Sequence, residues 1–123
     1  MHIHLVFVAK YRRRIFTKRV LKDMGEVFHS VCLDFNAELV EFDGEYDYVH
    51  LLINYPPKVA ISKLVNSLKG VSSRLIRKKG YPSVKKALWG NSFWSPSYFA
   101  GSCEGAPISV IRQYIEAQQR PKE

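Results

Sequence analysis

Two kinds of apolar periodicity follow one another along this chain, and their order limits the folds that it can adopt. Short runs rich in branched residues, typical of buried strands, occupy His2–Ala9, Ala37–Phe42 and Tyr48–Ile53. Apolar residues instead recur at three- and four-residue steps from Lys18 to about Phe35 and from Ile61 to about Lys79, as in amphipathic helices. The pattern predicts strand, helix, strand, strand and helix, in that order.

Turn-forming residues divide these elements and predict two more. Asp43-Gly44 favours a hairpin turn, and Gly80-Tyr81-Pro82 ends the second helix and opens a loop. Phe93–Ala100 is expected to form a final strand with an aromatic face, and Pro107 suits the first turn of a C-terminal helix. One face of that helix would carry Ile108, Ile111 and Ile115. The order β-α-β-β-α-β predicts an α+β, ferredoxin-like or RRM-like sandwich with strands one and three in the centre.

Size and composition predict a single-domain protein without a membrane segment or a disulfide. A chain of 123 residues has room for a single domain, spanning residues 1–123. It lacks the run of roughly 20 apolar residues that a membrane helix needs, so we expect no membrane segment and a cytoplasmic location. Cys32 and Cys103 are far apart and lack metal-binding spacing, which predicts two reduced thiols.

Charge is unevenly distributed along the chain, whose formal net charge is +8. Six of the eleven acidic residues fall between Asp34 and Asp47, and none lies between Tyr48 and Cys103. The second predicted helix lies in this acid-free segment, which argues against ion pairs within the molecule and favours an anionic partner. Because each phosphate neutralised by lysine or arginine releases counterions, basic clusters of this kind favour nucleic acid. The alternative is a solvated basic surface.

Two basic segments are candidates for DNA contact. The first follows the first strand, where guanidinium groups could grip phosphates and a tyrosine ring could stack on an unpaired base. The second is the outer face of the basic helix. The predicted DNA-binding residues are Lys10, Tyr11, Arg12, Arg13, Arg14, Lys69, Arg74, Arg77 and Lys78. The aromatic residues Phe93, Trp94, Tyr98 and Phe99 are expected in the core or at a dimer contact.

Two pairs of polar residues are candidates for chemistry. Side chains alternate across a strand, so Tyr48 and His50 should share one face. Tyr114 and Gln118 are four residues apart, so they should share a face of the C-terminal helix. A tyrosine hydroxyl near a divalent cation can attack a phosphodiester. Taken singly, each of these residues is more often an ordinary packing or surface residue.

Four segments together resemble one protein family over nearly the whole chain. HLVFVAKYRRRIFT, VHLLINYPPKVAISKLVNSLKGVSSRLIRK, LWGNSFWSPSYFAGSC and GAPISVIRQYIEAQ are similar, in order and spacing, to blocks of the TnpA-type, single-tyrosine HUH transposases of small insertion sequences. The resemblance implies a ferredoxin-like homodimer that recognises hairpin ends and nicks single-stranded DNA. It also implies a 5'-phosphotyrosine intermediate, a free 3'-hydroxyl, and Mg2+ or Mn2+ as cofactor.

By the same resemblance, Tyr114 matches the nucleophile, His50 the second histidine of the His-hydrophobe-His pair, and Gln118 the helical metal ligand. The family's tyrosine helix can serve the partner subunit's site. This chain departs from the pattern at Tyr48, where the family has its first histidine. A neutral phenol is a poor ligand for a hard cation, so we expect weaker metal binding. His2-Ile3-His4 also spells His-hydrophobe-His, but it matches the family's first strand and stays outside the predicted metal site.

Three functions therefore remain open at this point. The first is a metal-dependent DNA strand transferase that uses Tyr114. The second is a catalytically weak or inactive DNA-binding relic or domesticated copy, because Tyr48 replaces a metal ligand. The third, an RNA-binding domain, follows from the strand order alone, since sheets of this type can stack bases.

Overall fold

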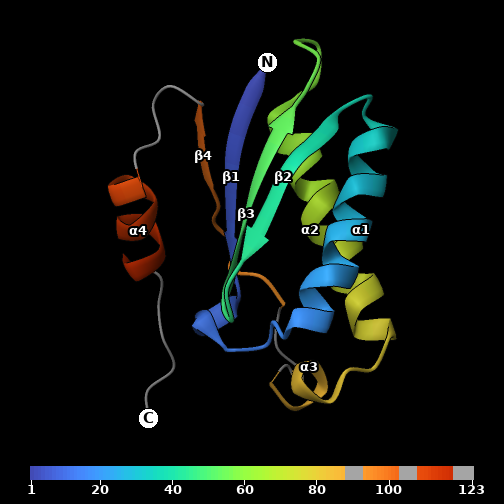
Figure 1. Ribbon diagram of the computed structural model, residues 1–123, viewed down its shortest axis with the longest axis vertical. Coiled ribbons are helices and arrows are strands. Elements are labelled where there is room, and N and C mark those ends of the chain that lie inside the picture. Colours follow the sequence, from blue (N-terminus) through green and yellow to red (C-terminus); the bar gives the residue numbers. More distant parts are fainter. Residues whose placement is uncertain (88–92, 103–107, 118–123) are drawn as a thin grey trace.

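The computed structural model describes residues 1–87, 93–102 and 108–117 (Figure 1). Its elements follow the predicted order, with two additional short helices. They are β1 (His2–Val8), η1 (Lys10–Arg12), α1 (Lys18–Asp34), β2 (Glu38–Gly44), β3 (Tyr48–Asn54), α2 (Ile61–Lys78), α3 (Pro82–Ala87), β4 (Phe99–Ser102) and α4 (Ile108–Ala117).

The four strands form one antiparallel sheet in the order β2-β3-β1-β4. β1 and β3 are therefore central, as the ferredoxin-like pattern predicts. Their register pairs Val6 with His50 and Val8 with Tyr48. This register fixes which side chains of the two strands meet on each face of the sheet.

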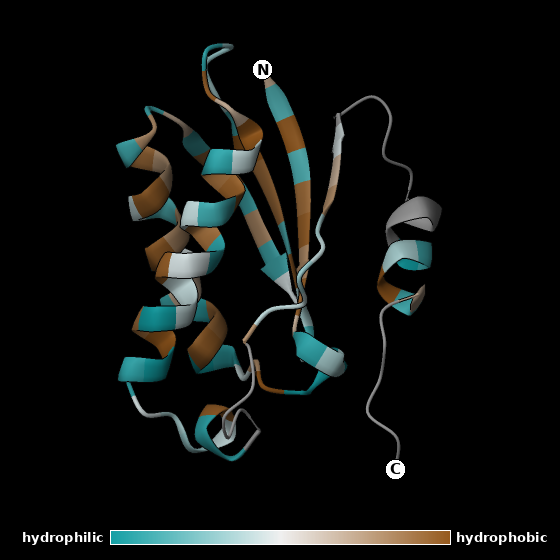
Figure 2. Cartoon of the chain, turned by 180° about the vertical axis from the view of Figure 1, so that it is seen from behind, coloured by the Kyte–Doolittle hydropathy of each residue, from teal (hydrophilic) through white to brown (hydrophobic). Residues whose placement is uncertain are grey.

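Helices lie on both sides of the sheet: α1 and α2 cover one face and α4 covers the other (Figure 1). The main core lies beneath α1 and α2, where Leu5, Phe7 and Leu51 of the sheet are fully buried with Phe28 of α1 and Leu68 of α2. Along β1, polar and apolar bands alternate only near the start of the strand, and the remainder is apolar (Figure 2), because both faces of the sheet are covered there.

α1 begins and ends where its local sequence allows. The Thr17 hydroxyl accepts a hydrogen bond from the Val20 amide at 3.2 Å, which caps a free amide of the first turn. At the other end Asn36 has a φ of 56°, a conformation that asparagine tolerates better than most residues. The chain can then turn back directly into β2.

The last strand begins later than predicted. β4 starts at Phe99, whereas Phe93 and Trp94 are buried in the core, and Trp94 forms only an isolated bridge with Ala9. The Trp94 indole N–H donates to the Ser72 hydroxyl at 3.0 Å. Both rings are buried in the main core, where they pack against each other and against Phe16, and this burial is favoured over a longer strand. The aromatic residues Phe93 and Trp94 therefore belong to the core as expected.

Two turns also differ from the sequence prediction. Gly44 is still paired with Val49 in the β2–β3 ladder, so the hairpin turn lies over residues 45–47 and not at Asp43-Gly44. The segment after Gly80, expected to be a loop, contains the short helix α3, which begins at Pro82. Gly80, with a φ of 74°, turns the chain after α2, and proline at the start of α3 loses no intrahelical hydrogen bond. Among the described helices, none is long and apolar enough to cross a membrane.

Candidate functional site

A small second core joins α4 to the outer face of the sheet. Val6 and Val8 of β1 are buried there against Ile115 of α4. Tyr48, Phe99 and Tyr114 pack against the edge of this cluster. Contact through Ile115 therefore holds both tyrosines on the face that α1 and α2 leave uncovered.

His50 lies on this same face. Along β3, Val49, Leu51 and Ile53 are buried in the main core, whereas Tyr48 and His50 point the other way, as alternation predicts. His50 is half-buried, and its pKa is lowered mainly by burial and further by nearby His4, against the opposing effect of Asp43 and Glu41. The imidazole is therefore favoured in its neutral form, which has a lone pair available.

His4 lies directly beside His50, although the family resemblance kept His4 outside the predicted metal site. Its Nδ1 is 2.8 Å from Nε2 of His50, and the two rings stack with centroids 4.9 Å apart. The cause is the antiparallel register: Val6 is opposite His50, so His4 is its diagonal neighbour on the same face. The contact between His4 and His50 can be predicted only from the pairing of β1 with β3, and not from the spacing of residues within either strand.

Tyr48 occupies the position at which the resemblance leads us to expect a histidine. Burial raises its pKa above the ordinary value, and Glu45, Asp47 and Asp43 raise it further, while Arg112 lowers it. The phenol therefore stays neutral at neutral pH and remains a poor metal ligand. It borders a cavity of about 290 Å³ lined by Asp43, Gly44, Glu45, Tyr48, His50, Arg112 and Ile115.

Tyr114 is held by a hydrogen bond between its hydroxyl and that of Ser97, with the two oxygens 2.9 Å apart. Its ring also packs against Phe99 at a centroid distance of 5.8 Å. Burial raises the pKa of Tyr114, and the Ser97 hydrogen bond partly lowers it again. Gln118, the predicted partner of Tyr114 on α4, lies outside the described residues.

The donor atoms on this face suit a metal ion in part. Among the described residues, no three histidine, cysteine, aspartate or glutamate side chains converge on one point. His4 and His50 nevertheless bring two imidazole nitrogens together. Two nitrogen donors are a partial ligand set, which a residue of α4 or a DNA phosphate would have to complete.

Two of the predicted DNA-binding residues are engaged within the fold. Arg12 forms an ion pair with Asp47 at 3.2 Å, and their side chains are only 11% and 14% exposed. Lys69 donates to the carbonyl oxygens of Ser95 and Ser97 at 2.7 and 3.3 Å. The main role of Arg12 and Lys69 in this structure is to hold loops in place.

The remaining basic residues lie nearer the surface. Arg14, Arg74, Arg77 and Lys78 are exposed, whereas the Tyr11 ring is flanked by Lys10 at 5.2 Å and Arg13 at 5.6 Å. The expectation that the basic helix forms no internal ion pair is wrong at its end, because Lys79 is 3.3 Å from Asp23 of α1. In Figure 1 the end of β1, the start of α1 and the end of α2 all lie at the lower end of the molecule.

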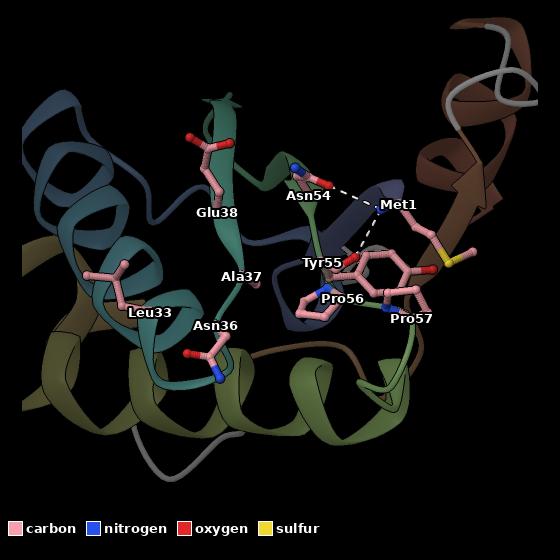
Figure 3. Close-up of a pocket in the computed structure, with 9 residues that line it drawn as sticks. All are labelled: Met1, Leu33, Asn36, Ala37, Glu38, Asn54, Tyr55, Pro56 and Pro57. Carbon is pink, nitrogen blue, oxygen red and sulfur yellow. Dashed lines mark hydrogen bonds between the residues drawn. The ribbon is translucent and has the colours of Figure 1, made fainter.

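A second hollow, of about 550 Å³, lies at the other end of β3, between the end of α1 and the segment after Asn54 (Figure 3). The Met1 amino group donates there to Asn54 Oδ1 at 3.1 Å and to the Tyr55 carbonyl at 3.0 Å. These contacts tie the start of β1 to the end of β3. The lining of this hollow contains none of the site residues discussed above.

Comparison with known proteins identifies the family of this chain. The family model described as "Transposase IS200 like" matches residues 1–118. The ISDra2 transposase TnpA of Deinococcus radiodurans is 30% identical over 118 residues, covering 96% of this chain and 84% of the relative. The IS200 transposase of Salmonella typhimurium is 29% identical over 115 residues, with coverage of 94% and 74%.

Solved structures lead to the same family. A crystal structure of a Deinococcus radiodurans protein assigned as a transposase superposes with a TM-score of 0.86 at 30% identity, covering 98% of this chain and 92% of the other. A REP-associated tyrosine transposase bound to a REP hairpin has a TM-score of 0.57 at 12% identity, covering 94% and 61%, and shares the fold. Since the family model spans almost the entire sequence, the chain belongs to the IS200-like transposase family.

Proposed function

We propose that this transposase cuts single-stranded DNA at hairpin-bearing ends and rejoins it through a 5'-phosphotyrosine intermediate on Tyr114. The observation that carries the proposal is the packing of α4, which sets Tyr114 on the sheet face that also holds His50. Family membership supports the reaction class. A nucleophile held on the same face as a neutral imidazole suits metal-assisted attack on a phosphodiester.

The proposed chemistry runs in two balanced steps. First, the Tyr114 oxygen loses its proton and bonds to phosphorus while the bond from phosphorus to the 3'-oxygen breaks, and that oxygen takes up a proton. In the second step the oxygen of a free 3'-hydroxyl loses its proton and bonds to phosphorus while the bond from phosphorus to the Tyr114 oxygen breaks, and the Tyr114 oxygen takes up a proton. Because burial raises the pKa of Tyr114, its proton leaves as the new bond forms, and the Ser97 hydrogen bond lowers the cost of the developing charge.

We further propose that His50 and Gln118 hold Mg2+ or Mn2+, as the family resemblance implies. A divalent ion, when bound, polarises the phosphate oxygens and offsets the charge that develops on them. The half-buried, uncharged His50 ring can offer a nitrogen without first losing a proton. Such ions keep several waters and need few protein ligands, so a small ligand set is sufficient.

The exposed basic residues supply the proposed DNA surface. Arg14 precedes α1 in the chain, and Arg74, Arg77 and Lys78 belong to the last turns of α2. The start of α1 and the end of α2 lie at the same end of the molecule (Figure 1). Charge on one side of a small domain attracts the phosphate backbone without reading its sequence. A homodimer remains part of the proposal and rests on the family resemblance.

The test incubates the protein and Mn2+ with labelled single-stranded DNA that contains the hairpins flanking the source locus. We expect a protein–DNA adduct that survives denaturation, and its loss in Tyr114→Phe. Tyr98→Phe is the matched control, because that tyrosine lies on the neighbouring segment and should leave the adduct unchanged. An adduct that persists in Tyr114→Phe would refute the assigned nucleophile.

Tyr48 supports a second candidate, a DNA-binding relic with a disabled metal site. Its neutral phenol replaces a histidine and borders the cavity beside His50. Under this alternative the parent chain binds hairpin DNA without forming an adduct, and Tyr48→His restores adduct formation. An adduct in the parent chain eliminates it.

A further inference from the structure

We infer that His4 and His50 bind one divalent transition-metal ion between β1 and β3, with His4 supplying the nitrogen that position 48 lacks. This inference deepens the proposed function, because it names a ligand and a metal preference for the same site. It adds a residue from a strand that the sequence pattern kept outside the metal site.

The first support is the geometry of the two imidazoles. His4 Nδ1 and His50 Nε2 face each other at 2.8 Å. With metal–nitrogen bonds of about 2.0–2.1 Å, two nitrogens at right angles around one ion lie about 3 Å apart. The side chains therefore need only a small separation to exchange their hydrogen bond for a shared metal ion.

The second support is the backbone beneath the rings. His4 and His50 belong to the two central strands, and ladder pairs on both sides of them fix the register. Ligands on such strands are positioned more accurately than ligands on loops. Because His4 is the diagonal neighbour of His50 across the two antiparallel strands, its Nδ1 lies beside His50, although position 48 on β3 has no histidine.

The third support is the charge around His50. Asp43 lies opposite His50 on β2, and Asp43 and Glu45 line the cavity that His50 borders. Arg112 lines the same cavity as Asp43 and Glu45. Among the described lining residues, two carboxylates therefore face one guanidinium, and this balance of charge favours a cation.

Two imidazole nitrogens also select among metals. Mg2+ prefers oxygen ligands, whereas nitrogen ligands suit first-row transition metals. We therefore expect Mn2+ to bind more tightly than Mg2+. The absence of a histidine at position 48 and the gain of His4 would leave a site of similar donor number on a different pair of strands.

The experiment titrates the DNA-free protein with Mn2+ and follows the free ion by electron paramagnetic resonance, with Mg2+ as competitor. We expect His4→Ala and His50→Ala each to weaken Mn2+ binding at least about 10-fold, the scale at which even supporting partners of metal ligands act. His2→Ala is the matched control, since His2 is an exposed histidine on the same face of β1. Amide NMR spectra of each variant check that the fold is retained.

A rescue variant makes the test sharper. If His4 replaces the missing nitrogen, Tyr48→His should restore Mn2+ binding to His4→Ala. Mn2+ affinity that is unchanged in His4→Ala, or that falls equally in His2→Ala, would overturn the inference. Adduct formation is measured separately: an adduct without a His4 effect on Mn2+ sinks only this inference, whereas His4-dependent Mn2+ binding without an adduct sinks only the proposed function.

Discussion

The hydroxyl groups of Ser97 and Tyr114 lie 2.9 Å apart and join the segment before β4 to α4. Tyr114 itself has a raised pKa because it is partly buried, and this hydrogen bond acts in the opposite direction. Ser97 thus holds the proposed nucleophile in place and makes loss of its proton easier. It is a positioning residue, since it acts through Tyr114.

Replacing Ser97 with alanine should slow adduct formation without changing affinity for hairpin DNA. A single hydrogen bond contributes about 0.5–1.5 kcal/mol, which corresponds to roughly a 2- to 10-fold change in rate. Single-turnover kinetics with Mn2+ measures the effect, in the Tyr48→His background if the parent chain forms no adduct. Ser97→Thr keeps the hydroxyl and should recover most of the rate; equal rates for Ser97→Ala and the parent would remove Ser97 from the mechanism.

Arg12 and Asp47 form the main ion pair at the end of β1. Their side chains are largely buried, and the Asp47 carbonyl also accepts from the Ala9 amide at 2.8 Å. Removing one partner leaves the other charge poorly solvated, so Arg12→Ala should lower the free energy of unfolding by about 1–3 kcal/mol. Urea denaturation measures this loss.

A pair between α1 and α2 provides the contrast for that experiment. Lys79 and Asp23 are 3.3 Å apart, but the Lys79 side chain is 49% exposed. Exposed pairs contribute little, so Lys79→Ala should cost less than about 1 kcal/mol. For the buried pair, a double-mutant cycle on Arg12 and Asp47 should show that the two losses in unfolding free energy are not additive. Additive losses would mean that the two side chains stabilise the fold independently.

The order of elements could be predicted because each has its own period of apolar residues. Alternation along β3 correctly separated His50 from the buried Leu51. The start of β4 could not be predicted, because the sequence does not show that Phe93 and Trp94 are buried in the main core instead of extending a strand.

Within the candidate site, the sequence predicted which residues share a face of one element, but not which elements meet. Tyr114 and His50 were assigned through the family resemblance, whereas His4 lies beside His50 only because β1 and β3 pair in one register. Ion pairs were missed for a similar reason: Asp23 is distant from Lys79 in sequence but lies on the neighbouring helix. A basic segment with no acidic residue nearby in the sequence can still form an ion pair with an acidic residue on a neighbouring helix.

Arg14 and Lys69 should respond differently when replaced by alanine. Arg14 is exposed, so Arg14→Ala should weaken binding to any hairpin DNA and reduce the slope of log affinity against log salt by about one. Lys69 is held by two loop carbonyls, so Lys69→Ala should mainly lower thermal stability. Fluorescence-anisotropy titrations at several salt concentrations measure the slope. A smaller salt slope in Lys69→Ala, with stability unchanged, would reverse this assignment.

Cys32 provides a pH-dependent test of the main core. Its thiol is fully buried in α1, and burial raises its pKa to about 11 from 9.0. Only the thiolate reacts with alkylating agents, so the folded protein should resist iodoacetamide at pH 8 while the urea-unfolded chain reacts. Mass spectrometry of a Cys103→Ser variant, in which Cys32 is the remaining cysteine, measures the difference.

The raised pKa of Cys32 also determines that the folded state becomes less stable as the pH rises. Between pH 9 and 11 the unfolded thiol loses its proton while the folded thiol keeps it, so the unfolded state binds fewer protons. The contribution of Cys32 to stability is therefore complete below pH 9 and is lost as the pH rises through 11. Cys32→Ala should show a shallower fall in urea midpoint over this interval than the Cys103→Ser parent. Parallel curves would mean that the Cys32 thiol is more accessible than its complete burial beneath the sheet allows.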